Sequence, residues 1–185
     1  MIHDIIFALW FLLPAAAANA APVFAAAIPG LKKLDAPIDA GKTWHGHALL
    51  GPHKTWRGFA AGIVVSTGIL ALQVLAATHI GSVGHIASPV DYGHLPILIL
   101  GPLFAIGALG GDAVESFFKR RFGITSGKAW VPFDQIDYII GSVIVSLPII
   151  ILNPWQYMWM FIVWFAMHLL ASYTGYKLGL KKDPI

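Results

Sequence analysis

The apolar residues of this chain lie in long blocks, and this arrangement constrains the fold more than any other feature of the sequence. Five blocks have the length of membrane-crossing helices, and they cover roughly residues 5–28, 58–78, 95–118, 137–152 and 155–175. A helix needs about 20 mostly apolar residues to cross a bilayer. Charged residues make up 11% of the chain, against about 25% in a soluble domain. The sequence therefore predicts an all-α integral membrane protein, a bundle of five transmembrane helices that forms one domain over residues 1–185.

The first block has to be distinguished from a cleaved leader. Ala18-Asn19-Ala20 has the small residues of a cleavage site, but no Lys or Arg precedes the apolar run, and a signal peptide begins with a basic segment. We therefore expect this segment to be retained as a spanning helix. Cysteine is absent, which excludes disulfides and thiolate chemistry.

All Lys and Arg residues fall in alternate connections of this five-span arrangement. They are Lys32, Lys33, Lys42, Lys54 and Arg57 after the first block, Lys119, Arg120, Arg121 and Lys128 after the third, and Lys177, Lys181 and Lys182 after the fifth. Connections rich in Lys and Arg stay in the cytoplasm. We therefore expect a multi-pass protein of the cell membrane, with the N-terminus outside, the C-terminus in the cytoplasm, and cytoplasmic loops at 29–57 and 119–136.

The cytoplasmic end of the third block carries an ionic stripe. Asp112, Glu115 and Lys119 follow one another at spacings of three and four residues, which places them on one helix face. Asp134 and Asp137 precede the fourth block at the same membrane face. Grouped carboxylates suit Mg²⁺, which completes its shell with water and substrate phosphates, and neighbouring cations suit a phosphate ligand. The pattern predicts a metal and phosphate site at the membrane surface.

The strictly apolar parts of the third and fourth blocks are short. Leu95–Gly111 and Tyr138–Leu152 would span about 22–26 Å, slightly less than the hydrocarbon thickness of about 30 Å. Either the bilayer thins here, or the carboxylates lie slightly below the headgroup plane in a polar cavity.

Simpler roles remain open for several of these residues. Asp134 is placed to cap the fourth helix, with Asp137 near its first turn. The run Lys119-Arg120-Arg121 has the composition of a solvated cluster that fixes topology, and for Arg121 we prefer this interpretation. His168 lies alone in the fifth block, where a hydrogen-bonded packing histidine is the better interpretation.

The first cytoplasmic loop ends in Gly51-Pro52-His53-Lys54-Thr55-Trp56-Arg57-Gly58. Thr55 is placed to cap the second helix, whose free amides also suit a phosphate, with Lys54 as a point charge. This signal is weak alone, because Lys-Thr before a helix is common. It gains weight because it lies on the same membrane face as the carboxylates.

Both loop motifs resemble those of the phosphatidate cytidylyltransferase family. Pro52–Phe59 resembles the family's proline-x-Lys-Thr-aromatic-x-Gly motif, while Gly111–Arg120 with Gly123-Ile124, Pro132 and Asp134–Asp137 resembles its C-terminal signature. The chain departs from the bacterial and eukaryotic members in having fewer spans, Thr125-Ser126 in place of a Lys-Asp, and Gln135 in place of an Arg. Its length and shortened signature resemble the archaeal branch of the family.

The resemblance implies a nucleotidyl transfer in which an isoprenoid ether lipid phosphate attacks the α-phosphate of CTP, with Mg²⁺ as cofactor. Because the attacking phosphate is already ionised, no general base is required. On this basis we expect catalytic roles for Asp112, Lys119, Asp134 and Asp137. The expected metal ligands are Asp112, Glu115, Asp134 and Asp137, with orientation of Lys119 as the alternative role of Glu115. The expected contacts to nucleotide or lipid phosphates are Lys54, Thr55, Arg57, Glu115 and Arg120.

We expect membrane lipids around the protein and no nucleic-acid partner. The GxxxG spacings, such as Gly107 to Gly111, fit close packing inside one bundle, which we prefer to a homodimer contact. A diacyl lipid phosphate is the alternative substrate, since the ether preference rests wholly on the resemblance. A small ion-binding transporter or scaffold is the alternative from another class. It would need polar residues through the membrane centre, whereas here they gather at one face.

Overall fold

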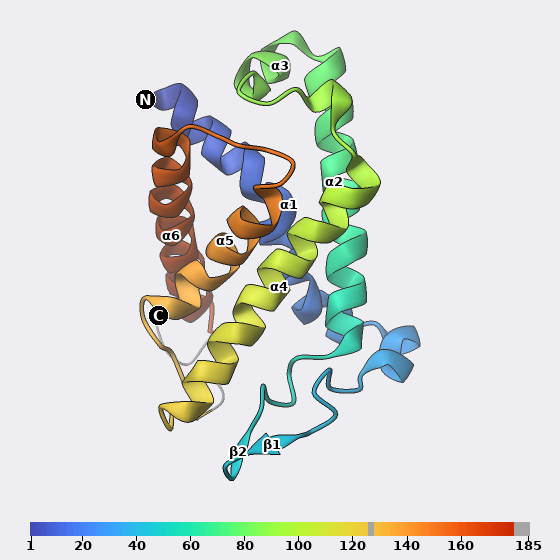
Figure 1. The fold of residues 1–185 in the computed structure, drawn as a ribbon, viewed down its shortest axis with the longest axis vertical. Helices are drawn as coiled ribbons and strands as arrows, with labels where there is room; N and C mark the ends of the chain where they lie inside the picture. Colours follow the sequence, from blue (N-terminus) through green and yellow to red (C-terminus); the bar gives the residue numbers. More distant parts are fainter. Residues whose placement is uncertain (126–127, 180–185) are drawn as a thin grey trace.

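The computed structural model describes residues 1–125 and 128–179, and most of them are helical (Figure 1). The elements in chain order are α1 (Ile2–Ala26), the 3-10 helix η1 (Pro29–Leu34), β1 (Thr43–Trp44), β2 (His47–Ala48), α2 (Trp56–His79), α3 (Gly81–Ala87), the 3-10 helix η2 (Tyr92–His94), α4 (Ile97–Arg121), α5 (Phe133–Ser146) and α6 (Pro154–Lys177). The two strands pair as a small antiparallel hairpin. Ser126, Lys181 and Lys182, which entered the sequence argument, lie outside the described residues.

Four of the described helices, α1, α2, α4 and α6, are long and apolar enough to cross a membrane. The helix α4 runs from Ile97 to Arg121 over 25 residues. The third span is therefore longer than its strictly apolar part suggested. The helix continues through the carboxylates into the cations, which agrees with the helical spacing expected for Asp112, Glu115 and Lys119. By contrast, α5 has 14 residues, which is about 21 Å of helix and less than the hydrocarbon thickness. The fourth block was expected to be helical as far as residue 152, but the segment after α5, from Leu147 to Leu152, is not helical.

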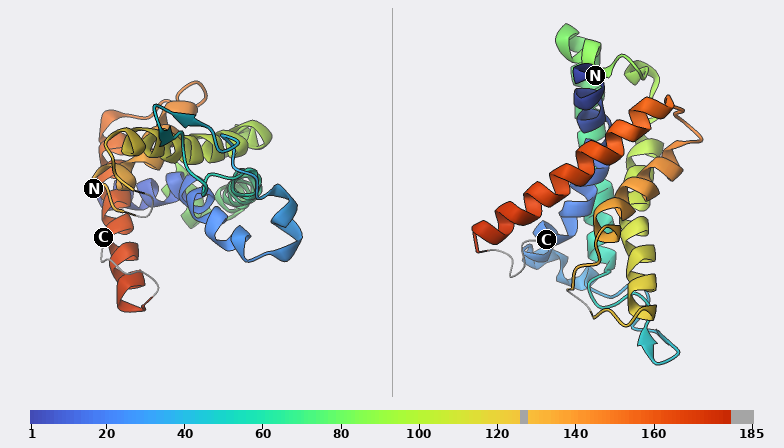
Figure 2. Two further views of the ribbon diagram at one scale, coloured as in Figure 1. Left: turned by 90° about the horizontal axis from the view of Figure 1, so that it is seen from below. Right: turned by 90° about the vertical axis from the view of Figure 1, so that its left-hand side faces the viewer.

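The helices alternate in direction between two ends of the molecule (Figure 1). One end holds the start of α1, the helix α3 and the start of α6. The other end, called the site end below, holds the hairpin and the junction between α4 and α5. The views in Figure 2 show α6 lying at a steep angle to the other helices, with its C-terminal end away from them. The described Lys and Arg residues all belong to segments at the site end, which is the grouping that the charge pattern predicted.

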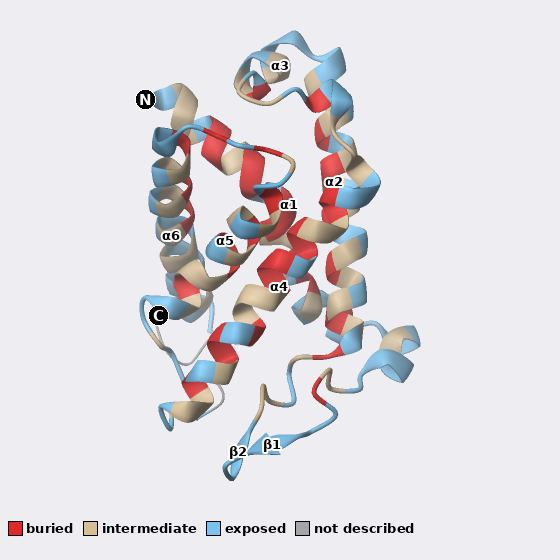
Figure 3. Cartoon of the chain, in the orientation of Figure 1, coloured by how far each residue is buried: buried red, intermediate tan, exposed pale blue. Residues whose placement is uncertain are grey.

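The core lies where α1, α4 and α5 meet (Figure 3). Phe7, Leu12, Leu100, Phe104 and Ile139 are almost completely buried there. On the outer faces, large apolar side chains are exposed, as at Val64 (72%) and Leu98 (83%). Burying such surface in lipid removes its contact with water, so this inside-out pattern suits a multi-pass membrane protein.

Glycines allow α4 and α5 to pack backbone against backbone. A Cβ on Gly107 would lie 2.6 Å from the carbonyl oxygen of Gly141, and a Cβ on Gly111 would clash with the carbonyl oxygen of Asp137. Small residues let helices approach this closely. The expected packing role of Gly107 and Gly111 is therefore confirmed, and it brings the two acidic segments together.

Candidate active site

The first loop delivers Lys54 to the end of α4. Lys54 Nζ lies 2.5 Å from Asp112 Oδ2, and the two side chains retain 18% and 28% of their exposure. Next to Lys54, the main chain at Thr55 pairs in the antiparallel sense with the main chain at Pro37. Thr55 then caps α2, because its Oγ1 accepts a hydrogen bond from Gly58 N at 3.2 Å. The expected cap is confirmed, and it fixes the residue next to Lys54.

Asp39 holds the rest of this loop in shape. Its carboxylate accepts hydrogen bonds from the backbone N–H groups of Gly41, Leu50 and Gly51 at 2.9, 2.9 and 3.4 Å. Burial acts to raise the pKa of Asp39, but these three hydrogen bonds to the charged form outweigh it, and the pKa lies below its ordinary value. The ionised Asp39 therefore organises the loop that carries Lys54.

Three carboxylates meet between α4 and α5. One oxygen each from Asp112, Glu115 and Asp137 lies within 4.8 Å of the others. Glu115 Oε1 is buried without a hydrogen-bond partner, but it forms an ion pair with Lys119 Nζ at 3.6 Å, which is the contact that its alternative role of orienting Lys119 requires. Three carboxylates this close together repel one another unless cations offset their charge. A divalent cation with oxygen ligands fits this cluster.

Asp134 lies beside this cluster and has other partners. Its Oδ1 accepts a hydrogen bond from Lys119 Nζ at 2.6 Å, and its Oδ2 accepts one from Trp130 N at 2.6 Å. Asp134 is in the first turn of α5, whose N-cap is Pro132, so it does not cap that helix. Among the residues expected to bind metal, Asp134 is the one that the compact group does not include. Its carboxylate instead holds Lys119 and the end of the second loop.

A polar cavity of about 320 Å³ encloses these groups. It is lined by Lys54, Asp112, Glu115, Lys119, Arg120, Asp134 and Asp137, together with Asn19, His53, Ser116 and His168. Thr55 and Arg57 are absent from this lining. Thr55 is occupied as a cap, and Arg57 pairs with Asp35 at 2.9 Å. Of the nine expected site residues, the structure thus brings seven to one cavity.

Asn19 and His168 were not expected at the site. Asn19 belongs to α1 and His168 to α6, and both helices are otherwise apolar nearby. A polar residue within a span usually faces the interior of the bundle or a cavity. From the sequence alone, this rule could have predicted that both side chains face the interior of the bundle. It could not have predicted which cavity they line. The ring of His168 lies 6.3 Å from that of Tyr138.

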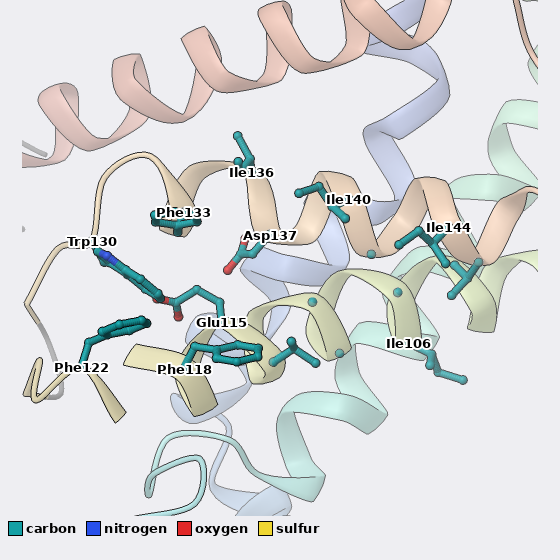
Figure 4. Close-up of a pocket in the computed structure, with 16 residues that line it drawn as sticks. Ile106, Glu115, Phe118, Phe122, Trp130, Phe133, Ile136, Asp137, Ile140 and Ile144 are labelled. Carbon is teal, nitrogen blue, oxygen red and sulfur yellow. The ribbon is translucent and has the colours of Figure 1, made fainter. Parts of the chain in front are cut away.

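An apolar groove of about 750 Å³ opens on the outer face of α4 and α5. Val114, Phe118, Phe133, Ile140 and Ile144 contribute its wall, and each of them is at least 40% exposed. Figure 4 shows the carboxyl groups of Glu115 and Asp137 at its inner side, between the two helices. Glu115 and Asp137 line the polar cavity as well, so the two spaces meet at these carboxylates.

Known proteins are similar to this chain in sequence and in fold. The family model described as CarS-like, CDP-archaeol synthase, matches residues 1–185. A CDP-archaeol synthase of Thermococcus onnurineus is 34% identical over 99% of this chain and 98% of its own length, and one of Methanospirillum hungatei is 37% identical over 80% and 89%. The solved structure of an intramembrane enzyme for archaeal membrane lipid biosynthesis has 31% identity and a TM-score of 0.71, and the match covers 89% of this chain and 91% of that one. The chain belongs to the CDP-archaeol synthase family.

Proposed function

We propose that this chain transfers the cytidylyl group of CTP to an archaeal ether lipid phosphate, forming CDP-archaeol and pyrophosphate. The observation that carries this assignment is the meeting of the polar cavity and the apolar groove at Glu115 and Asp137. A reaction between a lipid phosphate and a nucleotide needs an apolar space for the lipid chains and a charged space for the nucleotide. The two spaces must meet where the phosphates react. Family membership supplies the identity of the two substrates.

Mg²⁺ is the metal that we assign to Asp112, Glu115 and Asp137. The group offers hard oxygen ligands and a buried oxygen, Glu115 Oε1, without a hydrogen-bond partner. When bound, Mg²⁺ would neutralise phosphate charge and polarise the α-phosphate. Asp134 supports this arrangement from outside the group by holding Lys119.

The chain's own residues orient two strongly charged reactants. The isoprenoid chains lie in the groove, which keeps the lipid phosphate at the depth of Glu115 and Asp137. Lys54 and Lys119 line the polar cavity, where they hold the phosphates of CTP and offset their repulsion. An ionised lipid phosphate oxygen forms a bond to the α-phosphorus, while the bond from that phosphorus to the β-phosphate oxygen breaks and pyrophosphate leaves. The nucleophile carries its own charge, so no side chain has to remove a proton.

The distribution of charges supports a proposal for the placement in the membrane. We infer five crossings, with α5 and the non-helical segment after it forming the fourth. The site end then faces the cytoplasm, because the described Lys and Arg residues gather there. This places the polar cavity on the side where CTP is made, and it places the groove against the bilayer.

The direct test is turnover by the purified full chain. Labelled CTP and a geranylgeranyl diether of glycerol phosphate should give a labelled CDP-lipid and pyrophosphate when Mg²⁺ is present, and no product with EDTA. A parallel reaction with diacyl phosphatidate examines the alternative substrate. Equal rates with both lipids would contradict ether preference, and no product with either lipid would refute the proposed transfer.

A further inference from the structure

A short amphipathic segment follows the first spanning helix at the site end. It consists of the 3-10 helix η1 and its N-cap residue Ile28. In a 3-10 helix, side chains three residues apart lie on the same side. Ile28, Leu31 and Leu34 therefore share one apolar side, and Lys32 and Lys33 lie on the others. These five residues are called the η1 patch below.

The η1 patch lies at the edge of the bundle and is exposed. Figures 1 and 2 show η1 as a short blue helix beside the start of α2, projecting from the other helices. Ile28 and Leu34 retain 50% and 44% of their exposure, and Lys32 and Lys33 are exposed as well. The ion pairs among the described residues include neither lysine. The patch therefore presents two unpaired cations next to exposed apolar side chains.

The helix before η1 places this patch near the lipid headgroups. Val23 and Phe24, in the last turns of α1, are exposed apolar side chains on a helix long enough to cross a membrane. Such side chains face lipid. Two residues separate the end of α1 from the start of η1, and they extend at most about 7 Å. Trp56, which is exposed at the start of α2, fits the same level, because tryptophan is enriched at membrane interfaces.

Anionic lipid headgroups are the partner that this composition fits. An interfacial segment buries its apolar side at the boundary of the acyl chains, while its lysines contact negatively charged headgroups. The lipid phosphate of the proposed reaction is itself an anionic lipid, so the leaflet that holds it carries the complementary charge. Lys32 and Lys33 are absent from the lining of the polar cavity, which separates them from the proposed nucleotide site. Because η1 is tethered to α1, it can bind the leaflet although it is short.

Contacts of the main chain and of one ion pair join η1 to the segment that carries Lys54. Asp35 is the C-cap of η1, and its carboxylate pairs with Arg57 at 2.9 Å. Ile38 N donates a hydrogen bond to the carbonyl oxygen of Lys54 at 2.8 Å. A change in the position of η1 is therefore transmitted to the backbone on both sides of Lys54.

We propose that the η1 patch binds anionic headgroups of the leaflet at the site end and thereby holds Lys54 in place. The binding to the leaflet goes beyond the proposed transfer reaction and does not depend on it. Its effect on rate rests on that proposed function. The result is an enzyme whose activity depends on the charge of the surrounding bilayer.

The natural absence of cysteine makes the binding directly measurable. Gly30→Cys introduces a single thiol in η1, at an exposed position where a Cβ would meet nothing within 4 Å. A nitroxide on this thiol is measured in the full chain, reconstituted in phosphatidylcholine bilayers with and without phosphatidylglycerol. Its collisions with a water-soluble nickel complex should become less frequent when phosphatidylglycerol is present. The ratio of bound to free η1 should rise about 25-fold, or about fivefold for each lysine.

Matched variants show whether the two lysines cause this difference. Lys32→Gln combined with Lys33→Gln should abolish the difference between the two bilayers, and the corresponding pair of arginine substitutions should retain it. Lys42→Gln combined with Lys128→Gln is the control, because it removes the same charge from exposed lysines of the two loops. This control should leave the difference unchanged.

Three results would overturn binding to the leaflet. The first is an equal collision frequency in the two bilayers. The second is an equal effect of the two double glutamine variants, because the net charge of the chain would then be sufficient. The third is a decrease caused by CTP or inorganic phosphate in phosphatidylcholine alone, because the lysines would then bind a soluble anion.

Hydrogen exchange at the amide of Ile38 measures the transmission to Lys54. Exchange should be slower with phosphatidylglycerol, and Asp35→Asn should remove this difference while the nitroxide still reports binding of η1. Initial rates with CTP and the lipid phosphate should be higher in the same bilayers. Binding without slower exchange at Ile38 would overturn the transmission. No turnover in either bilayer would refute the proposed transfer alone, whereas turnover with equal collision frequencies would overturn the η1 proposal alone.

Discussion

Lys54 and Asp112 form an ion pair across 58 positions of the sequence, with Nζ to Oδ2 at 2.5 Å. The pair joins the first loop to the acidic end of α4. It places one cation next to the carboxylates that we assign to metal and leaves it facing the polar cavity. Lys54 is therefore the lysine of the first loop for which we propose a role in the reaction.

Lys54→Gln should lower kcat/KM by about 10²–10³-fold, the usual effect of losing one preorganised group that stabilises transition-state charge. Steady-state kinetics with CTP and the lipid phosphate measure it. Lys42→Gln is the matched control, because Lys42 is an exposed lysine of the same loop and is absent from the cavity lining. Equal losses in the two variants would mean that only the general charge of the loop matters.

Glu115→Gln and Asp134→Asn should differ in their response to Mg²⁺. Glu115 belongs to the compact carboxylate group, so its variant should need a higher Mg²⁺ concentration for half-maximal rate. Asp134 accepts hydrogen bonds from Lys119 and Trp130, so its variant should lose rate with little change in the Mg²⁺ requirement. Titrations of rate against Mg²⁺ compare the two. A large shift for Asp134→Asn would place it among the ligands, as the sequence first suggested.

Val114→Trp should raise the KM for the lipid phosphate and leave the KM for CTP unchanged. Val114 is 58% exposed and lines the apolar groove, so a larger side chain there takes up space for an isoprenoid chain. Val64→Trp is the control on α2, because Val64 is 72% exposed and lies outside the groove. An increased KM for CTP in Val114→Trp would argue against the groove as the lipid site.

Acid should release the first loop through Asp39. The pKa of Asp39 is lowered from its ordinary value of 3.8 in the folded protein, so the folded loop favours the carboxylate. Its contribution to stability is complete above that ordinary value and is lost as pH falls through the lower, folded pKa. Hydrogen exchange at the amides of Leu50 and Gly51 measures the effect. Asp39→Asn should show fast exchange at every pH, and protection in that variant equal to wild type would contradict the role of Asp39.

Seven of the residues that line the polar cavity were expected at the site from the sequence, because the main signals are local, and their roles in the reaction stay a prediction. Helical spacing places Asp112, Glu115 and Lys119 on one face, and the grouping of cations predicts which loops lie at the same end. Lys54 was added to this site because it precedes a helix start at the same membrane face, and Pro52–Phe59 also carries the family resemblance. Helical spacing depends on residues that are close in sequence, and the grouping of cations depends on the side of the membrane. Both can be analysed without knowing how side chains pack.

Other features depend on tertiary contacts that no spacing reveals. Asp134 and Asp137 are equivalent in sequence pattern, but only Asp137 joins Asp112 and Glu115, while Asp134 contacts Lys119 and Trp130. Arg57 was expected near a phosphate, and the structure pairs it with Asp35. The strictly apolar count stops at Asp112 and underestimates the span, whereas the third block of 95–118 is close to the observed helix Ile97–Arg121, because a helix can continue through residues that line a cavity.

Gly111 and Gly110 are adjacent but should respond oppositely to alanine. A Cβ on Gly111 would clash with the backbone of Asp137, whereas one on Gly110 would meet nothing within 4 Å. Gly111→Ala should destabilise the fold by about 1–3 kcal/mol, as overpacking does, and it should lower activity because α5 must move and take Asp137 with it. Gly110→Ala should stabilise by about 0.5–1 kcal/mol, since alanine is favoured over glycine in a helix. Thermal unfolding in detergent, followed by helical circular dichroism, compares the two, and a lower unfolding temperature for Gly110→Ala than for Gly111→Ala would refute the close α4–α5 contact.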